Sequence, residues 1–201
     1  MTVITLSREM GSRGDEVAMA VAERLGLRLV GRAIINRAAQ DAGAGEAALA
    51  ELDELGLLGV KPSAASLKRY REKIVEIIAA QAAEGNVLLV GRGGQVVLGQ
   101  HRNVLHVRVT APLELRQAMV QEQCKVSTEV AAARVAASDA ARASYHKRHF
   151  GVRWDDETLY DVILNMARLT VAAAVETVCA AATAQLLDTP DAPAEGCGCE
   201  S

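Results

Sequence analysis

A glycine-bearing segment near the N-terminus holds the first residues that could bind a phosphate group. Arg8 and Arg13 could supply positive charge, and Gly11 and Gly14 let the backbone approach a ligand closely. Where such a segment joins a strand to a helix, backbone N–H groups and the helix dipole favour an anion. The predicted phosphate-binding set of this segment also includes Ser7, Ser12 and Asp15. An ordinary turn with helix-capping acids explains these residues equally well, because the pattern G-x-x-x-x-G-K-[ST] is absent.

The departure from that phosphate-binding pattern is specific. When Val17-Ala18 is aligned with the apolar pair that follows the pattern, Gly14 takes the lysine position and Asp15 takes the Ser/Thr position. The two expected glycines then fall at Arg8 and Arg13. A shift of the register by one residue does not recover the pattern.

Arg92 is the second candidate, in the sequence Gly91-Arg92-Gly93-Gly94 directly after the apolar run Val87–Val90. An arginine at that point can bind a phosphate or carboxylate through two parallel hydrogen bonds. Functional residues gather at the carboxyl ends of buried parallel strands. We therefore favour a binding role over a solvent-facing arginine in a glycine turn.

A stripe of four residues spaced by four, Arg134, Ser138, Arg142 and His146, lies on one face of a predicted helix that Ser127 can cap. Its two arginines stand two turns, ~12 Å, apart. That spacing suits a mobile element closing over a polyphosphate. A solvated charged face is the simpler interpretation of the stripe taken alone.

The cysteines predict no metal site. Cys197 and Cys199 could form a soft-metal or redox pair, but two thiols cannot fill a zinc site and no histidine is nearby. We therefore favour incidental thiols in a tail. Cys124 and Cys179 fall within helical patterns, where small buried side chains are expected.

Five short apolar runs alternate with helical patterns and must position these residues. They are Val3–Leu6, Leu27–Val30, Val87–Val90, Val104–Val109 and Tyr160–Leu164. No two are joined by a tight hairpin turn, which predicts a parallel sheet covered on both faces. Both glycine-rich turns follow strands, at the edge where such sheets bind ligands.

Composition limits the partners. The chain has 201 residues, 50% hydrophobic and 2% aromatic, with a net charge of -3. The scarcity of aromatic platforms argues against single-stranded nucleic acid, and the charge argues against a general polyanion binder. No apolar run suits a signal peptide or membrane span, so we expect a cytoplasmic protein.

Three stretches together resemble the cytidylate kinase-like family of nucleoside monophosphate kinases. They are ITLSREMGSRGDEVAMAVAERLG, VLLVGRGGQVVLGQHRNVLHVRVTAPLELR and SDAARASYHKRHFGVRWDDETLYDVILNMARL. The resemblance implies a P-loop kinase fold over residues 1–187, with a nucleoside monophosphate-binding insertion at about 32–84 and a lid at about 125–155. Residues 188–201 are expected to be a disordered tail.

The resemblance also implies a reaction, transfer of the γ-phosphoryl group of ATP, with Mg²⁺, to CMP or dCMP. Catalysis there is mainly positioning and charge neutralisation. By analogy, the segment from Gly11 to Asp15 would line the ATP phosphates, Arg92 would bind the acceptor phosphate, and Arg142 would be the lid arginine. Two further arginines, Arg134 and Arg168, would support phosphate binding.

The chain departs from the family at three places. The lysine and hydroxyl of the phosphate loop are absent, and Gly31-Arg32 replaces an acid that often follows the second strand. Where cytidylate kinases have a Gly-Arg-Asp turn, this chain has Gly91-Arg92-Gly93. Asp15, Glu16 or water remain as Mg²⁺ ligands.

The sequence thus predicts a three-layer α/β P-loop kinase-like fold with a five-stranded parallel sheet. The first functional hypothesis is a kinase with Arg13, Arg92 and Arg142 in catalysis, in which Arg13 partly replaces the missing lysine. The second is a weak or inactive nucleotide-sensing or interaction module on the same fold. A thiol-tailed metal-handling protein is the third. Neither the acceptor base nor the oligomeric state follows from the sequence.

Overall fold

The computed structural model describes residues 1–45, 47–48, 62–99 and 101–185. The predicted tail over 188–201, and most of a helix that the sequence pattern predicts over 46–57, lie outside the described residues. The strands are β1 (Val3–Arg8), β2 (Arg28–Val30), β3 (Val87–Val90), β4 (Val104–Thr110) and β5 (Val162–Asn165). The helical segments are α1 (Gly14–Leu25), α2 (Arg32–Ala39), the π-helical η1 (Gln40–Ala44), α4 (Ala64–Glu84), α5 (Gly94–Val97), α6 (Leu113–Cys124), α7 (Thr128–Phe150), the 3₁₀-helical η2 (Glu157–Leu159) and α8 (Val171–Gln185).

The strands form one parallel sheet in the order β2-β3-β1-β4-β5, which confirms the predicted five-stranded parallel sheet. β1 runs two residues beyond the predicted Val3–Leu6, because Ser7 and Arg8 pair with β4. β5 begins two residues later than predicted, because the N–H of Tyr160 closes η2 by donating to the carbonyl of Glu157 at 3.1 Å.

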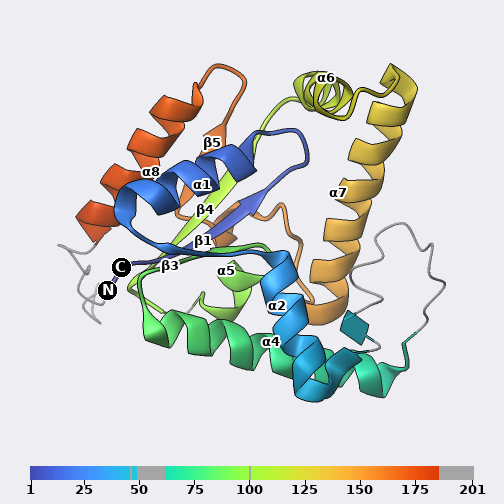
Figure 1. Ribbon diagram of the computed structural model, residues 1–201, viewed down its shortest axis with the longest axis vertical. Coiled ribbons are helices and arrows are strands. Elements are labelled where there is room, and N and C mark those ends of the chain that lie inside the picture. The colour runs from blue at the N-terminus through green and yellow to red at the C-terminus, as the bar shows by residue number, and fades with distance from the viewer. Residues whose placement is uncertain (46, 49–61, 100, 186–201) are drawn as a thin grey trace, which may run out of the picture.

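Two helical layers cover the sheet, so the three-layer α/β fold is also confirmed (Figure 1). Along β1, Ile4 and Leu6 pack with α1 and α8, whereas Val3 belongs to the cluster that includes α2 and α4. This alternation follows from the two-residue period of a strand. The core between the sheet and helices α1 and α8 is built almost wholly from aliphatic side chains, as the composition requires.

The chain leaves neighbouring strands β1 and β3 toward opposite faces of the sheet. β1 leads to α1 on one face, and β3 leads to α5, which packs with α4 on the other. Such a switch opens a crevice at the carboxyl ends of the two strands. Helices α6 and α7 stand beside this crevice (Figure 1).

Local signals fix the helices that flank the crevice. The Ser127 hydroxyl accepts a hydrogen bond from the N–H of Val130 at 3.4 Å, so the predicted cap of α7 is confirmed. Cys179 is buried as predicted, but the prediction for Cys124 is wrong, because it ends α6 on an exposed turn. Within the described residues, no helix combines the length and the apolar character needed to cross a bilayer.

Candidate functional site

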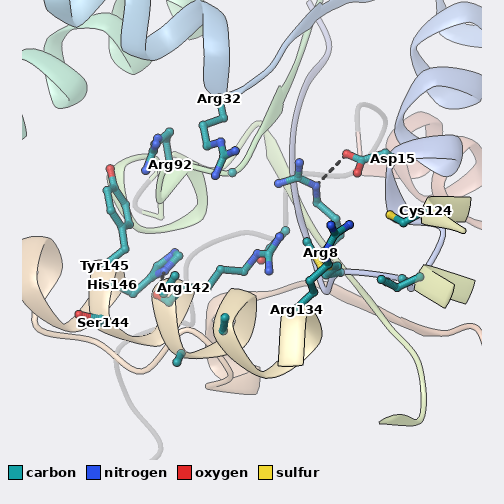
Figure 2. Close-up of a pocket in the computed structure, with 18 of the residues that line it drawn as sticks. Arg8, Asp15, Arg32, Arg92, Cys124, Arg134, Arg142, Ser144, Tyr145 and His146 are labelled. Carbon is teal, nitrogen blue, oxygen red and sulfur yellow. Dashed lines mark hydrogen bonds and ion pairs between the residues drawn. The ribbon is translucent and has the colours of Figure 1, made fainter. Parts of the chain in front are cut away.

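A cavity of about 760 Å³ opens at the carboxyl ends of β1 and β3, against one side of α7. Six arginines are among the described residues that line it, namely Arg8, Arg32, Arg92, Arg134, Arg142 and Arg148. Within the same set, the only carboxylate is that of Asp15, which accepts a hydrogen bond from Nε of Arg8 at 2.9 Å (Figure 2). The cavity is therefore strongly positive, although the whole chain has a net charge of -3.

The loop between β1 and α1 forms one wall of this cavity. Gly11 has a φ of 78°, and a Cβ there would lie 2.9 Å from the carbonyl carbon of Arg116, so no larger residue fits. The buried Ser12 hydroxyl donates to the carbonyl of Glu9 at 2.8 Å. The Glu9 carboxylate turns away and bonds to Arg108 and Arg116, so its negative charge does not line the cavity.

The loop after β3 holds Arg92 in a strained, buried conformation. Gly91, Arg92 and Gly93 have consecutive φ values of 79°, 55° and 76°, and Arg92 is only 8% exposed. A left-handed conformation costs a non-glycine residue roughly 1–2 kcal/mol, and such strain concentrates at ligand-binding sites. The Arg92 guanidinium lies over the ring of Tyr145, 4.7 Å from its centroid.

Helix α7 carries the predicted stripe along the cavity. Arg134, Arg142 and His146 line the cavity, and the Arg142 guanidinium donates to the Ser138 hydroxyl within the same stripe. Nδ1 of His146 lies 2.9 Å from the carbonyl of Arg142 and therefore carries the proton, which leaves Nε2 to accept from the Gln95 amide at 3.2 Å. Burial lowers the pKa of His146, so its imidazole is neutral near pH 7.

Four of the arginines repel one another across the cavity. Burial, followed by the charges of Arg8 and Arg32, lowers the pKa of Arg142 to about 10. Burial, followed by the charges of Arg92 and Arg8, also lowers the pKa of Arg32. A bound anion relieves this repulsion, because each guanidinium then faces an opposite charge. The arrangement can hold a compact group with several negative charges, such as a polyphosphate.

Comparison with known proteins places the chain in a family. The sequence model of the cytidylate kinase-like family matches residues 3–168. This chain belongs to the cytidylate kinase-like family. Comparison with curated protein sequences finds no match.

Solved structures similar to this family member have P-loop kinase folds. An uncharacterized protein from Eubacterium ventriosum matches with a TM-score of 0.73 at 18% identity, over 91% of this chain and 99% of that one. A shikimate kinase from Acinetobacter baumannii, crystallised with shikimate, matches with 0.52 at 12% identity, over 94% and 96%. A gluconokinase from Sinorhizobium meliloti matches with 0.52 at 11% identity, over 91% and 92%. At these identities the likeness shows the fold alone.

The structure brings most of the predicted site residues together. Those that line the cavity are Ser7, Arg8, Gly11, Asp15, Arg92, Arg134 and Arg142. Ser12, in the loop, and Gly14, at the start of α1, are buried and lie outside the lining. Arg13 is exposed outside the lining, and its guanidinium donates to both carboxylate oxygens of Glu16, at 3.1 and 2.8 Å. Arg168 is exposed and also lies outside the lining.

Sequence reasoning missed two of the arginines that line this cavity, Arg32 and Arg148. Arg32 starts α2 just past the end of β2, so the rule that singled out Arg92 applies to it as well. In the family comparison the missing acid falls at Gly31, and Arg32 only follows it. Arg148 falls outside the four-residue spacing of the α7 stripe, and no pattern signals it.

The described residues offer few carboxylate ligands for a magnesium ion at the cavity. They contain no group of three or more His, Cys, Asp or Glu side chains arranged to hold a metal. Mg²⁺ is usually held by one or two carboxylates together with substrate phosphates. Asp15 is the single carboxylate along the described lining, and it is already paired with Arg8.

Proposed function

We propose that this protein binds ATP and a pyrimidine nucleoside monophosphate in the arginine-lined cavity and transfers the γ-phosphoryl group between them. One observation carries the proposal: the guanidinium groups of Arg8, Arg32, Arg92 and Arg142 converge on a single cavity at a strand-end crevice (Figure 2). In the reaction, the bond from the γ-phosphorus to its bridging oxygen breaks, and an acceptor phosphate oxygen bonds to that phosphorus. The products are ADP and a nucleoside diphosphate.

The position of each arginine in the cavity suggests its role. Arg32 from α2 and Arg92 from the loop after β3 influence each other electrostatically, and they form the acceptor-phosphate end. Arg8 ends β1 beside α1 and serves the donor phosphates. The charges of both Arg8 and Arg32 act on Arg142. Arg142 therefore lies between the two ends and stabilises the phosphoryl group during its transfer. Phosphoryl transfer relies mainly on such positioning and charge neutralisation.

Magnesium enters this proposal only as the companion of ATP. A Mg-ATP complex brings the ion with its own water and phosphate ligands, and the protein adds at most the exposed Asp15 carboxylate. Most of the charge neutralisation therefore falls to the guanidinium groups.

A coupled assay of ADP release tests the proposal. The native protein with Mg-ATP should release ADP in the presence of CMP or dCMP, and chromatography should recover the matching diphosphate. Arg142→Ala should lose most of this turnover. Arg153→Ala should keep it, because Arg153 is exposed and pairs with the nearby Asp155. A rate of ADP release that does not rise when any nucleoside monophosphate is added would contradict the assigned acceptor class.

A second function, nucleotide binding without efficient turnover, has its own support. Gly14 stands at the lysine position, Arg13 bonds to Glu16 outside the cavity, and no lysine is among the described lining residues. A sensing or interaction module needs only the binding half of the chemistry. Tight binding of ATP and CMP, combined with ADP release at the background rate, would favour this function over the kinase.

A further inference from the structure

The side chain of Arg8 fills the space that a side chain at position 14 would need. Arg8 ends β1, and its aliphatic stem crosses directly over Gly14 at the start of α1. A Cβ on Gly14 would lie 2.9 Å from Cγ of Arg8, and closer still to its Cβ. Real Cβ atoms do not approach another carbon this closely, so position 14 can carry no side chain while position 8 carries one.

The side chain of Arg8 also brings its guanidinium into the cavity, near Asp15 and Gly91. Nε donates to Asp15 Oδ1 at 2.9 Å, and Nη1 lies 3.3 Å from where a Cβ on Gly91 would stand. The guanidinium therefore lies between the first turn of α1 and the loop that holds Arg92. Its charge contributes to the lowered pKa of both Arg32 and Arg142, which places it within electrostatic reach of both groups.

The sequence register gives this packing a meaning. In the pattern G-x-x-x-x-G-K-[ST], the first glycine falls at Arg8 and the lysine falls at Gly14. One position has gained a long cationic side chain, and the other has lost one. We propose that the two changes compensate: Arg8 supplies the phosphate-binding cation of this loop, and Gly14 is glycine because Arg8 occupies the space of the lysine. This proposal deepens the proposed function and rests on it.

Arg13 is the rival for the same role, and its contacts point elsewhere. It has a φ of 63° at a position where the pattern has glycine, and its guanidinium is held by Glu16 along the outer face of α1. The partner of Arg8, by contrast, is an Asp15 side chain that is 71% exposed. Exposed ion pairs are weak, so a phosphate can displace the Asp15 carboxylate as the partner of the Arg8 guanidinium. A guanidinium can then bind two phosphate oxygens in parallel.

A mutant cycle without ligand tests the packing half of the proposal. Gly14→Ala should lower the melting temperature by several degrees while Arg8 is present. In an Arg8→Gly background the same change should leave the melting temperature unchanged or raise it, because alanine favours a helix over glycine. An equal effect of Gly14→Ala in both backgrounds would overturn the claim that Arg8 excludes a side chain at position 14.

Calorimetric titration with ATP and with inorganic tripolyphosphate tests the binding half. Arg8→Ala should weaken both affinities about 10- to 100-fold, the range of a lost charge-assisted contact. Arg8→Lys should restore part of the loss, and the exchange Arg8→Gly with Gly14→Lys should restore most of it. Arg13→Ala should cost far less than Arg8→Ala. Arg153→Ala is the control for a change of one exposed charge.

The possible outcomes separate this proposal from the proposed function. If Arg142→Ala abolishes ATP binding while Arg8→Ala changes it less than about threefold, the function stands and the role of Arg8 falls. A larger loss for Arg13→Ala than for Arg8→Ala gives the role to Arg13. Native protein that binds neither ATP nor tripolyphosphate overturns both proposals. If the exchange variant does not fold, Arg8→Ala and Arg8→Lys still decide the question.

Discussion

The guanidinium carbon of Arg92 stands 4.7 Å from the ring centroid of Tyr145, and this contact joins the loop after β3 to helix α7. The same junction includes Phe150, which packs against Gly93 so closely that a Cβ there would lie 2.8 Å from its Cζ. His146 adds a hydrogen bond to Gln95 of α5. The C-terminal half of α7 is thus fixed to the loop after β3 and to α5, and Arg142 lies on a packed helix.

Replacing Arg92 should separate stability from binding. Arg92→Ala and Arg92→Gly should both weaken nucleoside monophosphate binding by roughly 1.5–3 kcal/mol, because each removes a charge-assisted contact. Arg92→Gly should nevertheless be more stable than Arg92→Ala by about 1 kcal/mol of unfolding free energy, because glycine accepts a φ of 55° without strain. Urea unfolding measures the difference. The reverse order of stability would remove the strain at Arg92 from the account.

Two glycines with similar backbones should respond differently to alanine. Gly93 and Gly151 have φ values of 76° and 71°, but only Gly93 has a close neighbour, the ring of Phe150. Gly151→Ala should cost about 1 kcal/mol of unfolding free energy through the backbone alone. Gly93→Ala should cost an additional ~1–3 kcal/mol, the range for overpacking. Equal losses in urea unfolding would show that the contact with Phe150 is not tight.

The ion pair between Arg116 and Asp139 should hold α7 against α6. Nη1 of Arg116 contacts both Asp139 oxygens, at 3.0 and 2.9 Å, and the Arg116 side chain is only 8% exposed. Asp139→Asn should destabilise the fold by about 1–3 kcal/mol, since the buried charge of Arg116 then relies on Glu9, which it shares with Arg108. Glu176→Gln, which removes the exposed pair with Arg24, should cost less than about 1 kcal/mol. Losses of the same size in the two variants would argue against this bridge between the helices.

Acidification should destabilise the protein through its buried histidines. Burial lowers the pKa of both His106 and His146 in the folded protein. Below about pH 6.5, these two histidines therefore bind more protons in the unfolded chain than in the folded chain. Stability must then fall as the pH falls below that value. A plot of melting temperature against pH should be flatter for His146→Gln than for native protein. A steeper plot for His146→Gln would reverse the assigned sign.

The sequence predicted the sheet well because periodicity and local turn chemistry determine it. The run Val87–Val90 is recovered residue for residue as β3, and Gly26 ends α1 with a φ of 63°, as a C-terminal glycine does. Strand ends were harder to predict. Ser7 and Arg8 are polar, and only their pairing with β4 makes them part of a strand.

The site was predictable in its location and only partly in its residues. Glycine-rich turns at strand ends pointed to the right edge of the sheet, and they brought Arg8 and Arg92 into one cavity. The direction of a side chain does not follow from its position in a loop. Sequence spacing therefore could not show that Arg13 bonds to Glu16 along α1 while Arg8 crosses Gly14.

Calorimetric titration of CMP into native protein, in the presence of a non-hydrolysable ATP analogue, tests the central claim that this cavity binds nucleotide phosphates through its arginines. The account predicts saturable binding that Arg142→Ala weakens at least tenfold, because Arg142 lies within the field of both Arg8 and Arg32. Arg153→Ala, which alters an exposed charge outside the cavity, should bind as tightly as native protein. Equal affinity in the native protein and in Arg142→Ala, or no binding by the native protein, would contradict the claim.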